Sequence, residues 1–139
     1  MKPLLLALAL TTAAWGLDVS KLEPSGYVND FAGVLDAQAR QVLETYCGNV
    51  ERSTGAQIAI VTVKSLEGDT VEDAAVRLFE KWKVGNAKTD EGVLVLLAVE
   101  DRKNRIEVGY GLEPVIPDGA AGDVLRAIRP VLRQGDYGG

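Results

Sequence analysis

The chain has 139 residues, of which 47% are apolar and 25% charged, which is enough for one globular domain with a buried core. Its formal net charge of −5 argues against nucleic acid as a partner, because nucleic acid requires a basic face. The lack of histidine excludes Ser-His-Asp and Cys-His triads, and the single cysteine excludes an intrachain disulfide. Any bound metal must therefore be held by oxygen atoms, which indicates calcium, magnesium or manganese.

Residues 1–16 have the features of a secretory signal peptide. Lys2 supplies a positive start, a short run rich in leucine and alanine follows, and Ala14 and Gly16 fit a cleavage site after Gly16. The apolar run is too short to span a bilayer comfortably. The alternatives are a buried N-terminal strand and a retained membrane anchor. We expect an exported chain, in the periplasm or outside the cell.

Residues 17–26 are polar and contain a proline, so we expect an extended lead-in before a domain over 27–134. Asn29, Asp30 and Gly33 indicate a turn, and Asp36 is a suitable N-cap for a helix over 36–53 that ends at Gly55. Its apolar residues recur every three or four positions and predict one buried stripe: Ala39, Val42, Leu43, Tyr46 and Val50. Cys47 lies in the same pattern and is expected to be a small buried hydrophobe.

Two nearly continuous apolar runs, 56–63 and 92–99, predict buried strands. Between them, Asp69 and Glu72 are expected to cap a helix that ends at Gly85 and Asn86. The alternating run 105–110 predicts a half-exposed partner of the second strand. A last helix should start at Asp118 or Gly119, turn four apolar residues inward, and kink or end at Pro130: Ala121, Val124, Leu125 and Ile128. Residues 135–139 begin a glycine-containing tail.

A strand–helix–strand crossover is right-handed in nearly all proteins, so the strands at 56–63 and 92–99 should be parallel. The return strand at 105–110 is antiparallel. The predicted fold is a three-layer α/β/α sandwich with a short mixed sheet, made of a parallel pair and an antiparallel hairpin strand.

This topology brings several carboxylates to the edge where strand 92–99 begins and strand 105–110 ends. Gly109 and Gly111 let the chain turn closely there, and Pro114 and Pro117 stiffen the loop. The expected metal ligands are Asp90, Glu113 and Asp118, with Asp30 able to reach either edge and Glu91 as a weaker candidate. Calcium requires about six to eight oxygen ligands, which carboxylates and backbone carbonyls would supply together.

Each of these acids also has a purely structural interpretation. Asp118 is a suitable helix N-cap, and Asp90 is a common turn residue. At the opposite edge, Asp101, Arg102 and Lys103 form a charged hairpin tip near the end of a parallel strand, where α/β folds bind ligands. A solvated turn that protects the sheet edge is the favoured interpretation of that tip.

Five stretches in order resemble the TPM domain family, the group of thylakoid-lumen, photosystem II repair and MOLO-type proteins with many exported bacterial members. They are "YVNDFAGVL", "TGAQIAIVTV", "LFEKWKVGNAKTDEG", "VLVLLAVEDRKNRIEVGYGLEPVIPD" and "IRPVLRQGDY". The resemblance runs over residues 26–137 and implies an α/β sandwich. The family's acidic positions fall on Asp30, Asp90, Asp101, Glu113 and Asp118, so the resemblance adds Asp101 as a further, weaker candidate metal ligand.

The resemblance implies two functions that the residues leave open. One is a module that binds calcium, or another hard ion such as Mg²⁺ or Mn²⁺, and supports a protein complex at or near a membrane. The other is a metal-assisted acid phosphatase acting on phosphate monoesters, in which carboxylates hold the ion. Many bacterial members continue into a membrane span, so anchoring through a segment absent from these 139 residues is also implied.

Overall fold

The computed structural model describes residues 16–139. The predicted signal peptide, apart from Gly16, lies outside the described residues. The lead-in is extended except for a 3₁₀ turn at Val19–Lys21, which packs against the second helix of the domain. Within residues 16–139, no helix is both long enough and apolar enough to cross a membrane.

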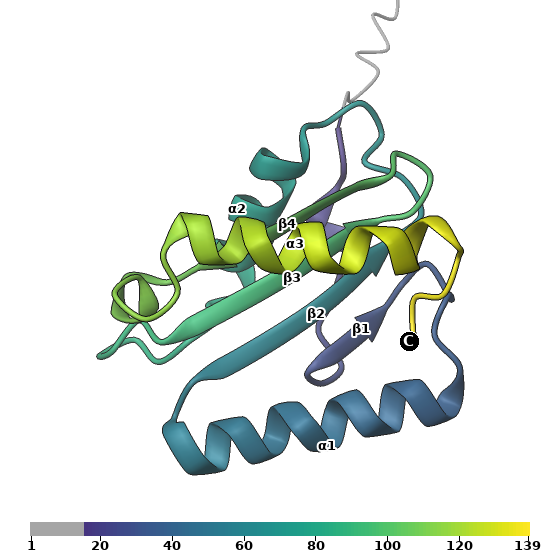
Figure 1. Ribbon diagram of the computed structural model, residues 1–139. Helices are drawn as coiled ribbons and strands as arrows, with labels where there is room; N and C mark the ends of the chain where they lie inside the picture. Colours follow the sequence, from purple (N-terminus) through teal and green to yellow (C-terminus); the bar gives the residue numbers. More distant parts are fainter. Residues whose placement is uncertain (1–15) are drawn as a thin grey trace, which may run out of the picture.

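A four-stranded sheet in the order β1-β2-β3-β4 forms the middle layer (Figure 1). Its strands are β1 Val28–Asp30, β2 Gln57–Val63, β3 Gly92–Ala98 and β4 Lys103–Val108. The first three strands are parallel, and β4 returns antiparallel to β3. The predicted parallel pair and hairpin strand are confirmed.

Three helices cover the sheet: α1 Ala37–Thr54, α2 Val71–Trp82 and α3 Asp118–Arg133. Helix α2 lies behind the sheet in Figure 1, whereas α1 and α3 lie on the other face, α1 beside β1 and β2 and α3 across β3 and β4. The predicted three-layer α/β/α sandwich is therefore confirmed.

The best-packed core lies between α2 and the sheet. Val61, Leu94 and Leu96 of the strands and Ala74 and Leu78 of α2 are fully buried. Burying a valine or leucine side chain stabilises a fold by about 1.5–3 kcal/mol, so this layer anchors the two long parallel strands. The ends of those strands, and the loops attached to them, are thereby held in place.

Helix α1 begins and ends where predicted, but its buried face is not the predicted one. Asp36 caps the helix by accepting from the Ala39 amide at 2.7 Å, and Gly55 ends it in a left-handed conformation. Cys47 is buried as expected, but Val42 is 61% exposed and Tyr46 63% exposed. The predicted stripe is wrong at these two positions, because the helix docks through the polar side chains of Arg40, Glu44 and Glu51 instead.

Three other local predictions need correction. Asn29 and Asp30 belong to strand β1 and not to a turn, because they pair with Val61 and Thr62 of β2. Thr70, and not Asp69, caps α2 by accepting from the Asp73 amide at 3.1 Å, and α2 ends at Trp82 with Lys83 in a left-handed conformation.

The last helix also differs in detail. Pro130 lies inside α3, which continues to Arg133, and Val124 is 50% exposed where burial was expected. Ala121 and Leu125 are buried as predicted. Only a few side chains therefore hold α3 against the edge of the sheet.

Candidate functional site

The pole at which β3 begins and β4 ends is built from two interlocked loops. Val93 pairs with Val108, so the chain before β3 and the chain after β4 must meet. The Gly109 amide donates to the Gly92 carbonyl oxygen at 2.8 Å, and the Gly111 amide donates to the Asp90 carbonyl oxygen at 3.1 Å. We call this region, residues 86–92 and 109–118, the Asp90 pole.

Glycine is required at this crossing. A Cβ atom at Gly109 would overlap the carbonyl oxygen of Asp90, and a Cβ atom at Gly111 would overlap the carbonyl oxygen of Thr89. These glycines let the loop after β4 approach the loop before β3 more closely than any side chain would permit.

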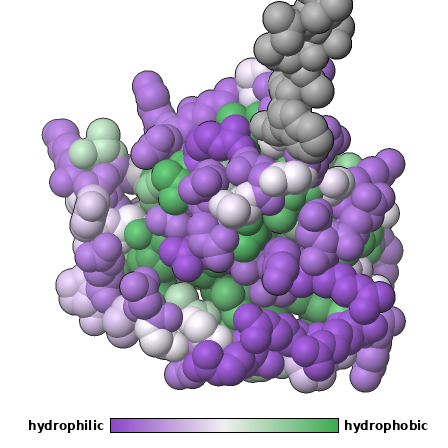
Figure 2. Space-filling model, turned by 90° about the horizontal axis from the view of Figure 1, so that it is seen from above, coloured by the Kyte–Doolittle hydropathy of each residue, from purple (hydrophilic) through white to green (hydrophobic). Residues whose placement is uncertain are grey.

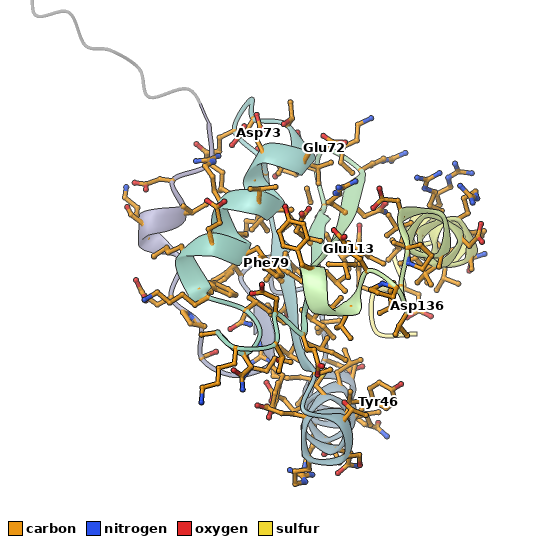
Figure 3. All side chains as sticks on the ribbon, turned by 90° about the vertical axis from the view of Figure 1, so that its left-hand side faces the viewer. Tyr46, Glu72, Asp73, Phe79, Glu113 and Asp136 are labelled. Atoms are coloured by element: carbon orange, nitrogen blue, oxygen red, sulfur yellow. The ribbon has the colours of Figure 1, made fainter. Side chains whose placement is uncertain are left out.

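Three of the predicted ligands belong to this pole. Asp90 is exposed and has a left-handed backbone with φ 51°, and Glu113 is exposed just after the 3₁₀ turn Tyr110–Leu112 (Figure 3). Asp118 is the first residue of α3, and Pro117 occupies the cap position that the sequence assigned to Asp118. An acidic first-turn residue is stabilised there by the helix dipole. Glu91 is half-buried, and its carbonyl oxygen accepts from the Gln57 amide at 2.9 Å.

The pole does not hold a preformed carboxylate cage. Among residues 16–139, no group of three or more acidic, cysteine or histidine side chains lies close enough together to hold a metal ion. An ion at this pole would thus take one or two carboxylates and complete its shell with backbone carbonyl oxygens and water.

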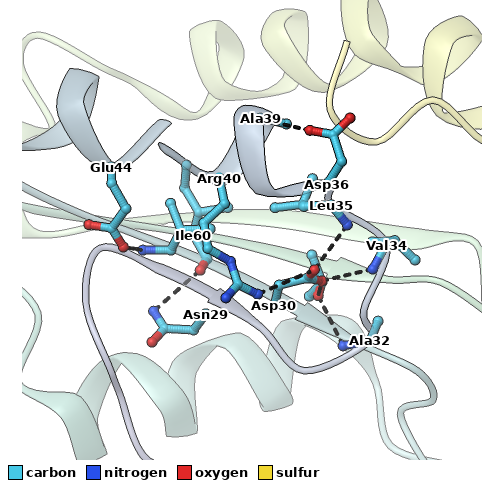
Figure 4. Close-up of polar contacts among 12 residues, drawn as sticks. Asn29, Asp30, Ala32, Val34, Leu35, Asp36, Ala39, Arg40, Glu44 and Ile60 are labelled. Carbon is cyan, nitrogen blue, oxygen red and sulfur yellow. Dashed lines mark hydrogen bonds and ion pairs between the residues drawn. The ribbon is translucent and has the colours of Figure 1, made fainter. Parts of the chain in front are cut away.

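Asp30 lies at the other end of the sheet. It pairs with Thr62, whereas the Asp90 pole adjoins Gln57, five residues back along β2 or about 16 Å at the usual rise per residue. Its side chain is 1% exposed and accepts from the Val34 amide at 3.1 Å, the Leu35 amide at 2.9 Å and the Thr62 hydroxyl at 2.6 Å (Figure 4). Arg40 adds an ion pair at 3.7 Å.

Burial raises the pKa of Asp30, but the hydrogen bonds from Thr62, Leu35 and Val34 and the charge of Arg40 outweigh it, so the pKa lies below its ordinary value. With both oxygens engaged, this carboxylate holds the turn between β1 and α1. Asp101 is similarly engaged, because its side chain accepts from the Leu66 amide at 2.7 Å. Neither residue joins Asp90, Glu113 and Asp118.

The structure also contains a basic cavity, of which the sequence analysis identified only the charged hairpin tip. A cavity of about 880 Å³ lies at the end of the sheet opposite the Asp90 pole, bordered by the β3–β4 turn, the start of α2 and the end of α3. Arg102 and Lys103 of the charged hairpin tip line it. Arg129 and Arg133, four residues apart on α3, line it too. The spacing of these two arginines is evident in the sequence. That they lie near the hairpin tip depends on where α3 crosses the sheet.

Together these features define the class of the protein: a small α/β/α domain with a mixed sheet, interlocked acidic loops at one pole and a basic cavity at the other. The chain matches the model of the TPM domain over residues 28–139 and belongs to that family. A search of curated proteins finds no match.

Solved structures share the fold. The solution structure of the N-terminal domain of a protein from P. gingivalis is 33% identical, with a TM-score of 0.75, and the match covers 81% of this chain and 72% of that one. The N-terminal domain of the cg2496 protein from Corynebacterium glutamicum is 20% identical, with a TM-score of 0.66 and coverage of 90% and 78%. The BA42 protein from Bizionia argentinensis is 26% identical, with a TM-score of 0.63 and coverage of 75% and 71%.

Proposed function

We propose that this TPM domain is an exported binding module that holds a divalent cation, calcium first, at the Asp90 pole. The observation that carries the proposal is the hydrogen bond from the Gly111 amide to the Asp90 carbonyl oxygen, at 3.1 Å. This bond ties two acid-bearing loops together. Loops that are already tied lose less conformational freedom when an ion joins them, so binding is less costly.

The chemistry of the pole suits a hard cation. Its side chains and backbone offer oxygen atoms, the chain has no histidine, and its one cysteine is buried in α1. Because no cage of three carboxylates exists among residues 16–139, we expect weak binding, on the order of 10⁻⁴–10⁻³ M as in extracellular calcium modules. Such an affinity is useful where calcium is abundant, as it is outside cells.

The second candidate from the family resemblance is a metal-assisted acid phosphatase. Catalysis of that kind needs the metal-holding carboxylates and the cations that stabilise phosphoryl oxygens in one site. Asp118 and Arg129 lie eleven residues apart on α3, or about 16 Å along a helix. A separation of this size works against one site that uses both groups, so we favour the binding module.

Calorimetric titration with calcium chloride tests the proposal. Wild-type protein should bind with a dissociation constant in the stated range, and Asp90→Asn combined with Asp118→Asn should abolish the heat. Asp123→Asn is the matched control, because Asp123 is an exposed acid of α3 that pairs with Arg126 outside the pole. Equal heats in the wild type and the double variant would refute a site at the Asp90 pole.

The same variants separate the two candidate functions. Release of p-nitrophenol from p-nitrophenyl phosphate that requires a divalent ion, and is lost in the double variant, would establish the phosphatase instead. Calcium binding without turnover supports the module.

Export and membrane association are part of the proposal. They rest on the signal-like composition of residues 1–16 and on the family resemblance. Expression of the chain from its own first residue should yield a processed, exported product that begins at Leu17, as measured by intact mass. An unprocessed product retained in the cytoplasm would refute export. The partner we infer is a membrane-associated protein complex.

A further inference from the structure

The cavity at the pole opposite Asp90 is lined by charged side chains from segments that are far apart in the sequence. The β3–β4 turn contributes Arg102, the first residue of β4 contributes Lys103, α3 contributes Arg129 and Arg133, and the first turn of α2 contributes Glu72. Its volume of about 880 Å³ lies within the range of about 300–1,000 Å³ that is typical of small-molecule sites.

The charge in this cavity opposes the charge of the whole molecule. Among residues 16–139, four cationic residues line it and Glu72 is the one acid that does, although the chain as a whole carries a net charge of −5. Elsewhere, Arg40, Arg77 and Arg126 each form an ion pair with an aspartate, whereas Lys64, Lys83 and Lys88 form none among residues 16–139. Within residues 16–139, none of the four cavity cations forms an ion pair.

Two further features favour an anion here. The cavity borders the first two residues of α2, and the amides at a helix start lack intrahelical acceptors and attract negative charge. Guanidinium groups bind phosphate oxygens in pairs, with both geometry and charge matched.

The cavity also has apolar walls. Leu97, Leu132 and Tyr137 line it beside the cations. Figure 2, seen from the side of β4, shows apolar surface between polar borders on this face of the molecule. A ligand with a charged part and an organic part would use both kinds of surface, because apolar walls bury the organic part while the few charged groups orient the ligand.

We propose that this cavity is a binding site for a soluble diphosphate-type anion, held by Arg102, Lys103, Arg129 and Arg133. The site binds its ligand without cleaving it. Within the part of the chain that the structure describes, Glu72 is the single carboxylate in the lining, so these residues do not supply the carboxylate pair that would hold a metal and activate water. The proposal does not depend on cation binding at the Asp90 pole.

Calorimetric titration with sodium pyrophosphate, at low ionic strength and with a chelator present, tests this site. Wild-type protein should bind pyrophosphate. The double variant Arg129→Gln and Arg133→Gln should bind it with an affinity at least about tenfold lower, because two charge-assisted contacts are lost. All the exchanged side chains are exposed, and thermal melting of each variant confirms that it folds. The chelator removes divalent ions, so a failure of calcium binding leaves this result unaffected.

Arg126→Gln is the matched control, because Arg126 has the same charge on the same helix but pairs with Asp123 and does not line the cavity. This variant should bind pyrophosphate within about twofold of wild type. If the control and the double variant lost the same affinity for pyrophosphate, the loss would be explained by the change in net charge alone, and the proposal would be overturned. No wild-type binding would also overturn it.

A second arm distinguishes a soluble ligand from a lipid headgroup, which carries the same phosphate chemistry. Sedimentation with phosphatidylglycerol vesicles should leave the protein in solution, because an acidic chain is repelled by an anionic surface while a small anion can enter the cavity. Binding to these vesicles without binding to pyrophosphate would overturn the proposal in favour of a membrane surface. Release of orthophosphate during the titration would overturn the claim that the ligand is not cleaved.

Discussion

At the scale of single residues, Asp30 is the most constrained acid of the domain. Its replacement by alanine would leave the Thr62 hydroxyl and the Val34 and Leu35 amides without their acceptor. Because a buried donor without a hydrogen-bond acceptor costs about 1–3 kcal/mol, we expect Asp30→Ala to lower the free energy of unfolding by about 3 kcal/mol or more. Urea denaturation measures this change. Asp123→Ala, at an exposed position, is the control and should change stability by less than about 0.5 kcal/mol.

The lowered pKa of Asp30 makes part of the stability depend on pH. Because the folded-state pKa lies below the ordinary value of 3.8, the folded state favours the ionised carboxylate. This contribution is therefore complete above the unfolded-state value and is lost as the pH falls through the folded-state pKa. The stability difference between wild type and Asp30→Asn should be constant from pH 7 to 5 and should shrink below pH 3.8. A difference that grows on acidification would contradict the assignment.

At the scale of elements, the crossing of the loops at the Asp90 pole depends on Gly109 and Gly111. A methyl group at Gly109 would overlap the Asp90 carbonyl oxygen, so Gly109→Ala forces the loops apart and should cost about 1–3 kcal/mol. Amide exchange should also speed up at Gly111, whose amide donates across the crossing. In contrast, a Cβ at Gly119, in the first turn of α3, meets nothing within 4 Å. Gly119→Ala should be neutral or stabilising by up to about 1 kcal/mol.

Helix α1 shows how a regular apolar pattern can indicate the wrong face. Its inward positions carry Glu44, which accepts from the Val28 amide at 2.7 Å, and Glu51, which accepts from Gln57 at 3.1 Å. Apolar spacing identifies the helix but not its orientation, because polar side chains with long-range partners resemble solvent-exposed ones in a sequence. Those partners lie in β1 and at the start of β2. Strand β1 has only three residues, which is too short for its pairing to be predicted from the sequence.

The orientation of α1 leads to a prediction about its apolar residues. Val42→Ser and Tyr46→Ser should each change the free energy of unfolding by about 0.5 kcal/mol or less, because both side chains are mostly exposed. Leu78→Ala, a fully buried leucine of α2, is the contrasting variant and should cost about 2–5 kcal/mol. A comparable loss in Val42→Ser would mean that this face of α1 is covered in solution.

At the scale of the whole molecule, the sequence predicts the layers and the long strands because their apolar runs are continuous and their connections allow one topology. It also places Asp90, Glu113 and Asp118 at one pole, since the antiparallel return of β4 requires that. It does not predict how close the carboxylates come, because this depends on the path of the loop between Gly109 and Asp118. The basic cavity is still harder to predict from the sequence, because Arg102 and Arg129 line one cavity only as a result of the way α3 crosses the sheet.

The reaction rate of the one cysteine, Cys47, reports whether α1 unfolds together with the rest of the fold. Cys47 is 1% exposed, and burial, with the nearby charge of Glu44, raises the pKa of its thiol, so the reactive thiolate is scarce in the folded state. A disulfide reagent at pH 8 should then react about a thousandfold or more slowly than in denaturant, at a rate set by unfolding of α1 from the sheet. Ser53→Cys in a Cys47→Ala background, on the exposed side of the same helix, should react without delay. If native Cys47 reacted as fast as this control, α1 would open independently, and the polar contacts of Arg40, Glu44 and Glu51 would not hold it to the sheet in solution.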